Sequence, residues 1–256
     1  MPFADHFSPT AAAYANFRPR YPDELFSWLA AESPDRERAW DCATGSGQAA
    51  TGLASHFRHV VATDPSVAQL AHADRNPRIT YAAMTAERSA IGAGTVALVT
   101  VAQALHWFDR PAFYAEVNRV LRPGGLLAVW SYALGAFGEP ALDRAIRRFY
   151  TDTVGPFWPA ERALIDAGYG ALDFPFEEVA PPMIPMQARW TLDQLAGYLS
   201  TWSAVRRARE ATGGDPLPEF VRELTPFWGL PGAAKTIRWP LEVRAGRRAG
   251  RVSDQQ

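Results

Sequence analysis

The stretch DCATGSGQAA, residues 41–50, carries two glycines, Gly45 and Gly47, at the spacing of a loop that cradles a nucleotide. The residues before it, RAWDCA, predict a strand, and those from Gln48 to Phe57 predict a helix. In an α/β sheet, a loop between the first strand and the first helix lies at the carboxyl ends of the strands, where such sheets bind ligands. Glycine lets backbone approach a ligand where a Cβ would collide. We therefore expect residues 41–50 to form the ligand-binding loop.

Strand and helix patterns continue after this loop. Asp109, followed by Pro111, is typical of a helix start, and RPGG should end that helix and turn the chain into the next strand. The later segments predicted as strands are HVVATD, RITYAA, TVALVTVAQAL and LLAVWSY. The fold class predicted is therefore α/β, a Rossmann-like, doubly wound and mostly parallel sheet with helices on both faces.

We expect one domain with four regions. An N-terminal helical lid, with one helix from Ser8 toward Asn16 and another in PDELFSWLAAE, precedes the cofactor-binding core. A helical insertion follows the fifth strand, with TLDQLAGYLSTWSAVRRARE as one helix capped by Thr191, and AAKTIRWPLEVRAGR as a final strand. The expected regions are the lid at 1–34, the core at 35–132, the acceptor-side insertion with the last strands at 133–240, and the strand end and tail at 241–256.

Composition narrows the function classes. The formal net charge of -1 provides no field that would hold nucleic acid or an anionic membrane. Cys42 is the one cysteine, which excludes an intramolecular disulfide and a multi-cysteine metal site, and the histidines have no metal-ligand spacing, so we expect no metal. The sequence has neither an apolar run of about 18 residues nor a signal-peptide pattern. We therefore expect a cytoplasmic protein; its oligomeric state cannot be read from the sequence.

Two acidic residues distinguish the nucleotides that such a loop could hold. Asp64 ends the second strand, where a carboxylate accepts hydrogen bonds from both hydroxyls of a ribose; the structural alternative is a plain turn with Asp64 as a helix cap. Asp41 stands just before the loop. A carboxylate there would repel the pyrophosphate of NAD, whereas it suits the sulfonium and ammonium of S-adenosylmethionine.

The sequence resembles the class I S-adenosylmethionine-dependent methyltransferases. The resemblance covers residues 5–132 well and rests on DCATGSGQ, VVATDPS, AQALHWFD and VNRVLRPGGLLAVW. The segments FSPTAAAYANFRPRYP and QALHWFD are similar to the branch that includes trans-aconitate methyltransferase and related small-molecule O-methyltransferases. One departure is Ala43, where the family more often has glycine.

This resemblance implies a role for each matching residue. Asp41, Gly45 and Gly47 would line the methionine end of the cofactor, with Ala43 and Gln48 in the same loop. The remaining implied cofactor contacts are Asp64 with Pro65 and Ser66 at the ribose, Ala86 and Glu87 at the adenine, Gln103 and Ala104 at the sulfonium, and Tyr14 and Arg18 in the lid.

The expected reaction is methyl transfer to a small-molecule acceptor, on an oxygen of a carboxylate or a hydroxyl, by in-line displacement. A carboxylate acceptor needs no base, whereas a hydroxyl does, and His106, after the fourth strand, is the candidate base. His106 and Trp107 are also candidates for the acceptor pocket. Two alternatives stay open from the sequence, an NAD-dependent oxidoreductase and a cofactor-binding protein without catalytic activity.

Overall fold

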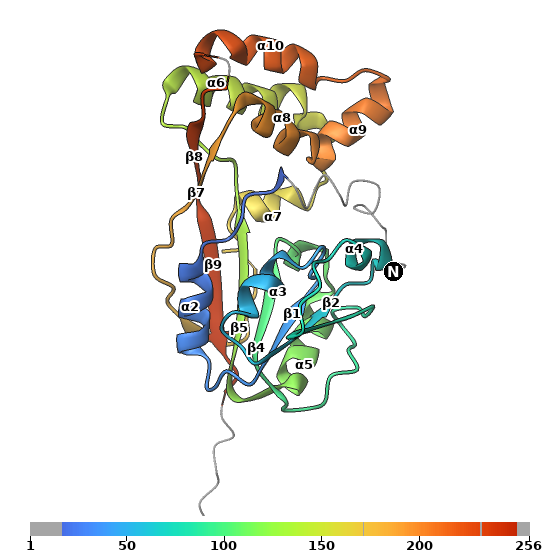
Figure 1. Ribbon diagram of the computed structural model, residues 1–256. Coiled ribbons are helices and arrows are strands. Elements are labelled where there is room, and N and C mark those ends of the chain that lie inside the picture. The colour runs from blue at the N-terminus through green and yellow to red at the C-terminus, as the bar shows by residue number, and fades with distance from the viewer. Residues whose placement is uncertain (1–16, 171, 231, 250–256) are drawn as a thin grey trace, which may run out of the picture.

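The computed structural model describes residues 17–170, 172–230 and 232–249. The helix predicted from Ser8 to Asn16, which includes Tyr14, lies outside the described residues. The described chain contains a core built on a sheet and a cap built mostly of helices, which stands beyond one end of that sheet (Figure 1).

Seven strands form the core sheet in the order β3-β2-β1-β4-β5-β9-β6. The first five in this order are parallel, whereas β9 pairs antiparallel with both β5 and β6. This arrangement is the predicted mostly parallel, Rossmann-like sheet. The strands are β1 (Arg38–Cys42), β2 (His59–Thr63), β3 (Ile79–Ala82), β4 (Val96–Ala102), β5 (Leu121–Tyr132), β6 (Glu177–Val179) and β9 (Leu241–Arg247).

Helices cover both faces of this sheet. One local prediction is confirmed: Asp109 caps α5 by accepting a hydrogen bond from the backbone N–H of Ala112. Ser66 caps α4 in the same way, by accepting from the backbone N–H of Gln69. The helix predicted from Gln48 is shorter than expected. The core helices are α2 (Asp23–Glu32), α3 (Gln48–Leu53), α4 (Val67–Ala71), the 3₁₀ turn η2 (Leu105–Trp107) and α5 (Arg110–Val120).

The segment RPGG differs from its prediction. It does not form a loop between helix and strand, because β5 begins directly after α5 and contains all four residues. The register between β4 and β5 shifts there, and Gly124 has a φ of 73°. A β-bulge at this point requires one residue with left-handed backbone, which explains why Gly124 occupies it. The expected alternation also fails once, because no helix lies between β3 and β4 in the described chain.

The cap contains most of residues 133–240. Its helices and turns are α6 (Pro140–Arg148), the π-helical turn η3 (Phe149–Thr153), η4 (Gly155–Phe157), α7 (Arg162–Asp166), α8 (Leu192–Ser200), α9 (Ser203–Thr212) and α10 (Leu217–Trp228). A two-stranded antiparallel sheet, β7 (Met186–Trp190) with β8 (Lys235–Trp239), joins them.

Two predictions in this region were incomplete, and one helix was missed. TLDQLAGYLSTWSAVRRARE forms two helices, which are separated at Thr201 and Trp202, although Thr191 does cap the first with a capping box. AAKTIRWPLEVRAGR forms two strands in different sheets, because Pro240 separates β8 from β9. Helix α10 was not predicted.

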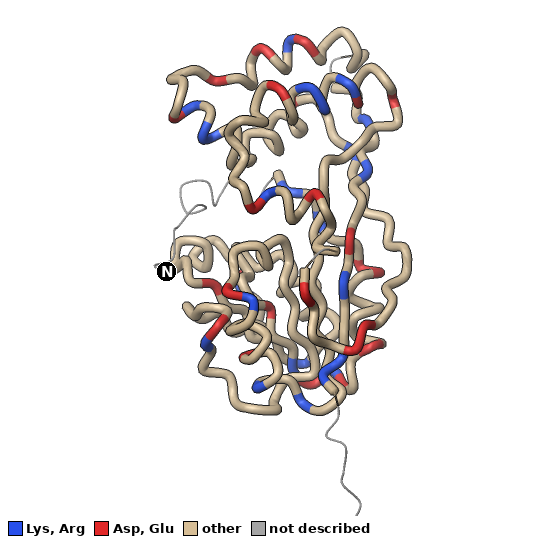
Figure 2. The backbone as a smooth tube through the Cα atoms, turned by 180° about the vertical axis from the view of Figure 1, so that it is seen from behind, with Lys and Arg blue, Asp and Glu red and all other residues tan. Residues whose placement is uncertain are grey.

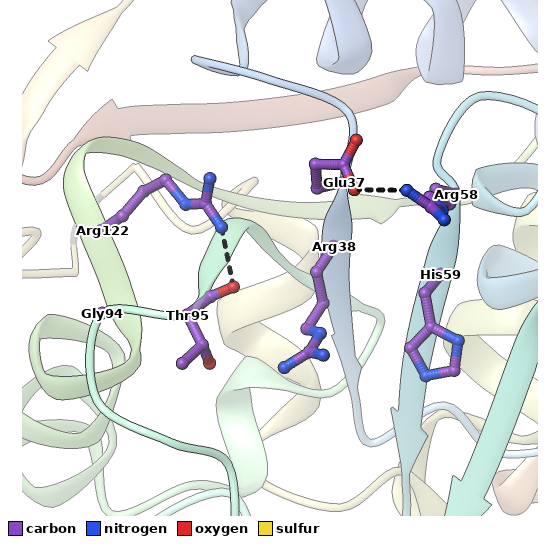
Figure 3. Close-up of a pocket in the computed structure, with 7 residues that line it drawn as sticks. All are labelled: Glu37, Arg38, Arg58, His59, Gly94, Thr95 and Arg122. Carbon is purple, nitrogen blue, oxygen red and sulfur yellow. Dashed lines mark hydrogen bonds and ion pairs between the residues drawn. The ribbon is translucent and has the colours of Figure 1, made fainter.

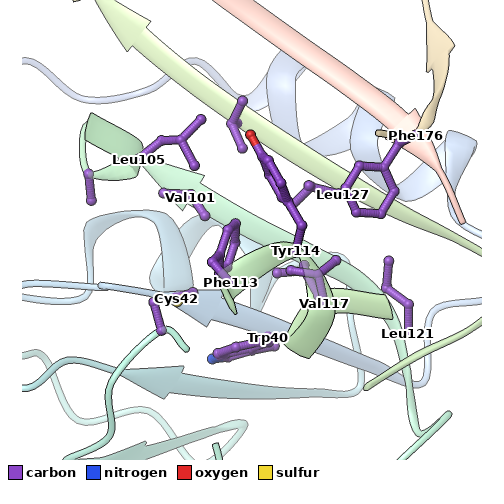
Figure 4. Packing of buried hydrophobic residues seen from close by; sticks show 14 of the residues in the cluster. Trp40, Cys42, Val101, Leu105, Phe113, Tyr114, Val117, Leu121, Leu127 and Phe176 are labelled. Carbon is purple, nitrogen blue, oxygen red and sulfur yellow. The ribbon is translucent and has the colours of Figure 1, made fainter. Parts of the chain in front are cut away.

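Each face of the sheet and the cap has its own hydrophobic core. On one face, β1, β4 and β5 pack against α5, with Trp40 and Phe113 fully buried (Figure 4). On the other face, α2 packs on α3: a Cβ on Gly52 would stand 2.2 Å from the Phe26 ring. The segment assigned to the lid at 23–32 is therefore part of the core. The cap core is largely aromatic.

Charges of both signs alternate over core and cap (Figure 2). Several arginines of the cap make ion pairs at its surface, among them Arg148 with Glu223 and Arg209 with Asp215. No helix within the described ranges is long and apolar enough to cross a bilayer.

Candidate active site

The glycine loop is held in place by a carboxylate from the neighbouring strand. Asp64, at the end of β2, accepts hydrogen bonds from the backbone N–H of Gly45 at 2.9 Å and of Ser66 at 2.8 Å. Gly45 and Gly47 have φ values of 57° and 84°, which glycine adopts without strain. A carboxylate accepts up to about four hydrogen bonds, so fixing the loop and binding a ribose are compatible roles.

Asp41 lies beneath the loop and is fully buried. Its carboxylate accepts hydrogen bonds from the hydroxyls of Thr44 and Thr100, which tie the loop to β4. Burial raises the pKa of Asp41 to about 6, although the two hydroxyls act in the opposite direction. The oxygens of Asp41 therefore hold the loop in place from below.

Three residues other than glycine have left-handed backbone in the described chain, and all three border one region. Ala43 follows β1 with a φ of 55°, Gln103 follows β4 with a φ of 58°, and Tyr169 has a φ of 59°. Such backbone is strained for residues with a Cβ and is found preferentially at functional sites. The geometry also explains why the family more often has glycine at the position of Ala43, since glycine would adopt this φ without strain.

Other predicted cofactor contacts lie at the same carboxyl edge. Ala86 and Ala104 are buried, Pro65 is half-buried beside Asp64, and Glu87 accepts a hydrogen bond from the backbone N–H of Asp109 at 3.2 Å. Gln48 donates to the carbonyl of Pro19 at 2.9 Å.

Arg18 lies between the core and the cap. Its guanidinium donates to the hydroxyl of Tyr132 at 3.1 Å and to the carbonyl of Thr201 at 3.4 Å, and it stands 5.6 Å from the centre of the Tyr198 ring. These contacts join the N-terminal segment to the cap. Arg18 also lines a pocket of about 300 Å³ together with Ser46 and Gln48 of the glycine loop.

His106 lies in η2, directly after β4, and is buried. Its Nδ1 is 2.9 Å from the hydroxyl of Tyr169, and its ring centre is 4.7 Å from that of Trp107. Burial, reinforced by the charge of Arg162, lowers the pKa of His106 to about 3. A histidine that holds a proton so poorly is an inefficient general base near neutral pH, so the base interpretation does not suit this environment.

One buried polar atom beside the loop was missed in the sequence. The Oε1 atom of Gln69, on α4, has no hydrogen-bond donor among the described residues, and it lies 3.9 Å from where a Cβ on Gly45 would stand. A buried acceptor without a donor is costly. The hydroxyls or the ammonium of S-adenosylmethionine would supply a donor, so the residues present fit this cofactor. A glutamine in a helix gives no signal of this in sequence.

The opposite end of the sheet has a pocket of about 660 Å³, lined by Glu37, Arg38, Arg58, His59, Gly94, Thr95 and Arg122. These residues stand at the amino ends of the strands, where Glu37 pairs with Arg58 and Arg122 donates to the carbonyl of Thr95 (Figure 3). The pocket is separate from the glycine loop.

No group of histidine, cysteine or carboxylate side chains suited to a metal ion occurs within the residues that the structure covers.

Known proteins were compared with this chain. A family model described as a methyltransferase domain matches residues 40–129. A protein of Dictyostelium discoideum named as a methyltransferase is 35% identical over 225 residues, which cover 87% of this chain and 86% of the relative. A methyltransferase of Mycobacterium tuberculosis is 34% identical over 154 residues, 54% of this chain and 62% of its own. A solved structure of a type II methyltransferase from Anaeromyxobacter dehalogenans has 44% identity and a TM-score of 0.86, covering 91% of this chain and 99% of that one.

Proposed function

This chain belongs to the class I S-adenosylmethionine-dependent methyltransferases, and we propose that it methylates an oxygen atom of a small-molecule acceptor. S-adenosylmethionine is its cofactor, and the NAD-dependent alternative is set aside. When bound, the cofactor supplies an activated methyl group. We further propose that the core holds the donor, and that residues 133–240 contribute most of the acceptor pocket.

The enclosure of His106 supports a small acceptor. Helix α7 of the cap packs against η2 and β5, so the region beyond β4 lies under a cap segment. Aromatic rings surround this region, and closed aromatic sites suit small molecules. A folded macromolecule would have to displace α7 to reach it.

The absence of a suitable base supports an oxygen acceptor that is already ionised, and this observation carries the proposal. Near the carboxyl ends of β1 and β4, three titrating side chains are ill suited to accept a proton: Asp41 is buried with hydroxyls on its carboxylate, the pKa of His106 is lowered to about 3, and burial raises the pKa of Tyr169. The carboxylates of Asp64 and Glu87 accept hydrogen bonds from backbone N–H groups. A carboxylate is ionised at neutral pH and needs no base.

Residues of this chain then act mainly by positioning. Asp64 fixes the glycine loop, and the strained turns at Ala43 and Gln103 shape the ends of β1 and β4. Transfer to a carboxylate forms a C–O bond as the C–S bond breaks, gives a neutral ester and releases no proton. Alignment of the two reactants can supply much of the rate acceleration.

The test is transfer of labelled methyl from S-adenosylmethionine to a panel of carboxylic acids, phenols, alcohols and amines, with trans-aconitate among the acids because of the branch resemblance. We expect label in the acids. Carboxyl methyl esters release volatile methanol in alkali, whereas aryl ethers and methylamines do not, so treatment with alkali identifies the atom that was methylated.

Several outcomes distinguish the alternatives. Alkali-stable label in phenols would support a hydroxyl acceptor, and label in amines would contradict the proposed oxygen chemistry. Binding of S-adenosylhomocysteine without turnover of any acceptor would favour a protein that has lost catalysis.

A further inference from the structure

A polar cluster joins the cap to the end of β4. Tyr169, which follows α7, is fully buried in strained backbone, and its hydroxyl meets Nδ1 of His106 at 2.9 Å. The two rings are nearly parallel, with centres 6.1 Å apart. Figure 1 shows α7 between the sheet and the rest of the cap. A strained residue that contacts the end of the central strand indicates a functional role for this contact.

The Tyr169 hydroxyl determines which nitrogen of His106 carries a proton. Burial keeps both the phenol and the imidazole neutral, and we assign the phenol O–H as the donor to Nδ1. Nδ1 then accepts, and the neutral imidazole carries its proton on Nε2. Within the described part of the chain, the hydrogen bond of the His106 ring is made by Nδ1. His106 therefore presents a hydrogen-bond donor.

Arg162, the first residue of α7, is fixed through one side of its guanidinium. Nε donates to the hydroxyl of Tyr150 at 2.9 Å and to Asp166 at 3.3 Å, and the Cζ atom stands 4.8 Å from the centre of the Trp158 ring. Among the described residues, no acceptor lies within hydrogen-bond distance of the two terminal nitrogens. The side chain is 18% exposed.

We propose that Arg162 binds a carboxylate group of the acceptor through its two terminal nitrogens, with Nε2–H of His106 as a second donor nearby. This inference rests on the proposed function and specifies the acceptor as a carboxylic acid with an apolar body. A guanidinium whose plane is fixed matches a carboxylate with two parallel hydrogen bonds. Each donor has an aromatic ring beside it for contact with an apolar body: Trp107 at 4.7 Å from the His106 ring and Trp158 at 4.8 Å from the Arg162 Cζ.

The electrostatics agree with this assignment. The charge of Arg162 lowers the pKa of both His106 and Tyr169, and α7, which begins at Arg162, packs against η2, which contains His106. Asp166 offsets part of this charge from the outer side, where it is exposed. Methylation turns the carboxylate into a neutral ester, so the product loses its ionic attraction to Arg162 and binds more weakly than the acid.

The experiment measures selectivity for the charged group. Carboxylic acids with apolar bodies, such as phenylacetate, are titrated calorimetrically into protein saturated with S-adenosylhomocysteine, beside their primary amides and methyl esters. We expect the protein to bind at least one acid about tenfold more tightly than its amide. Arg162→Gln should reduce that ratio to about one, with the affinity for S-adenosylhomocysteine unchanged.

Arg206→Gln is the matched control. Arg206 lies on α9, is 20% exposed and pairs with Glu210 four residues later, as Arg162 pairs with Asp166. This variant should keep the full preference for the acid. Arg162→Lys keeps the positive charge and the aliphatic part of the side chain, and it replaces Arg162→Gln if that variant does not fold. It should lower the acid-to-amide ratio at least threefold, because lysine lacks the planar guanidinium.

Two results would overturn the inference. One is an unchanged acid-to-amide ratio in the Arg162 variant that folds, and the other is the absence of any preference for an acid in the unmodified protein. Failure of the unmodified protein to bind S-adenosylhomocysteine would instead contradict the cofactor assignment, so the two failures can be told apart.

Discussion

The donor side of the site rests on strands whose buried side chains are mostly aliphatic, whereas the cap packs through rings. Val96 to Val101 of β4 are buried without a break, and the carboxylates beside this sheet bond to backbone or hydroxyl groups. In the cap, the Phe149 ring stacks on Phe220 with centres 4.1 Å apart. In our proposal, hydrogen bonds position the methyl donor, whereas aromatic rings and the charge of Arg162 shape the acceptor pocket.

Acid titration should separate the two sides most strongly. In the unfolded chain Asp41 titrates near 3.8, and in the folded protein near 6. The native state therefore holds an extra proton between these values, so the free energy of unfolding falls by about 3 kcal/mol as pH rises through this range. His106 has the opposite sign: its pKa falls from 6.5 to about 3, so the free energy of unfolding rises as pH rises from 3 to 6.5.

These two effects oppose each other in the intact protein between about pH 4 and 6. Asp41→Asn should therefore leave a protein that loses stability on acidification from pH 6.5, and His106→Gln one that gains stability from pH 6 to 4. Urea unfolding of the three proteins from pH 4.5 to 7 measures both slopes. Parallel curves for the three proteins would show that neither environment shifts its pKa.

The difference between the core and the cap also explains which features the sequence could predict. The glycine loop, Asp64 and the cap at Asp109 depend on contacts within a few residues or on the ends of adjacent strands, and pattern suffices for those. The break between α8 and α9 depends on the cap, because Trp202 leaves the helix to pack against Phe149 and Trp158. The contact between Tyr169 and His106 joins two regions with no common motif.

Substitution of Asp64 tests the cofactor-binding side of the site separately from the cap. Asp64→Asn keeps the shape but removes one acceptor oxygen and the charge, so the loop loses a hydrogen bond and the ribose loses its carboxylate. We expect at least a tenfold weaker affinity for S-adenosylhomocysteine, measured by calorimetry.

Asp109→Asn is the control for this change, because Asp109 also accepts a backbone N–H but lies at the start of α5. Asparagine caps a helix about as well as aspartate, so the free energy of unfolding should fall by no more than about 1 kcal/mol, through loss of the charge at the helix N-terminus, and affinity should be unchanged. Equal affinities in the two variants would reduce Asp64 to a local structural residue.

The smallest expected effect concerns Gln69, whose buried Oε1 lacks a donor in the described chain. Gln69→Leu removes that acceptor in a similar volume, so the protein without ligand should be as stable as before or more stable, because an unsatisfied buried acceptor costs about 1–3 kcal/mol. Affinity for S-adenosylhomocysteine should nevertheless fall about three- to tenfold, since one neutral hydrogen bond contributes roughly 0.5–1.5 kcal/mol.

Gln194→Leu provides the opposite pattern: Gln194 completes the capping box of α8 in the cap, so its loss should lower stability and spare affinity. If Gln69→Leu lowered both quantities together, the amide would be a packing residue of α4, and hydrogen bonding to the cofactor would then depend on Asp64 and the loop.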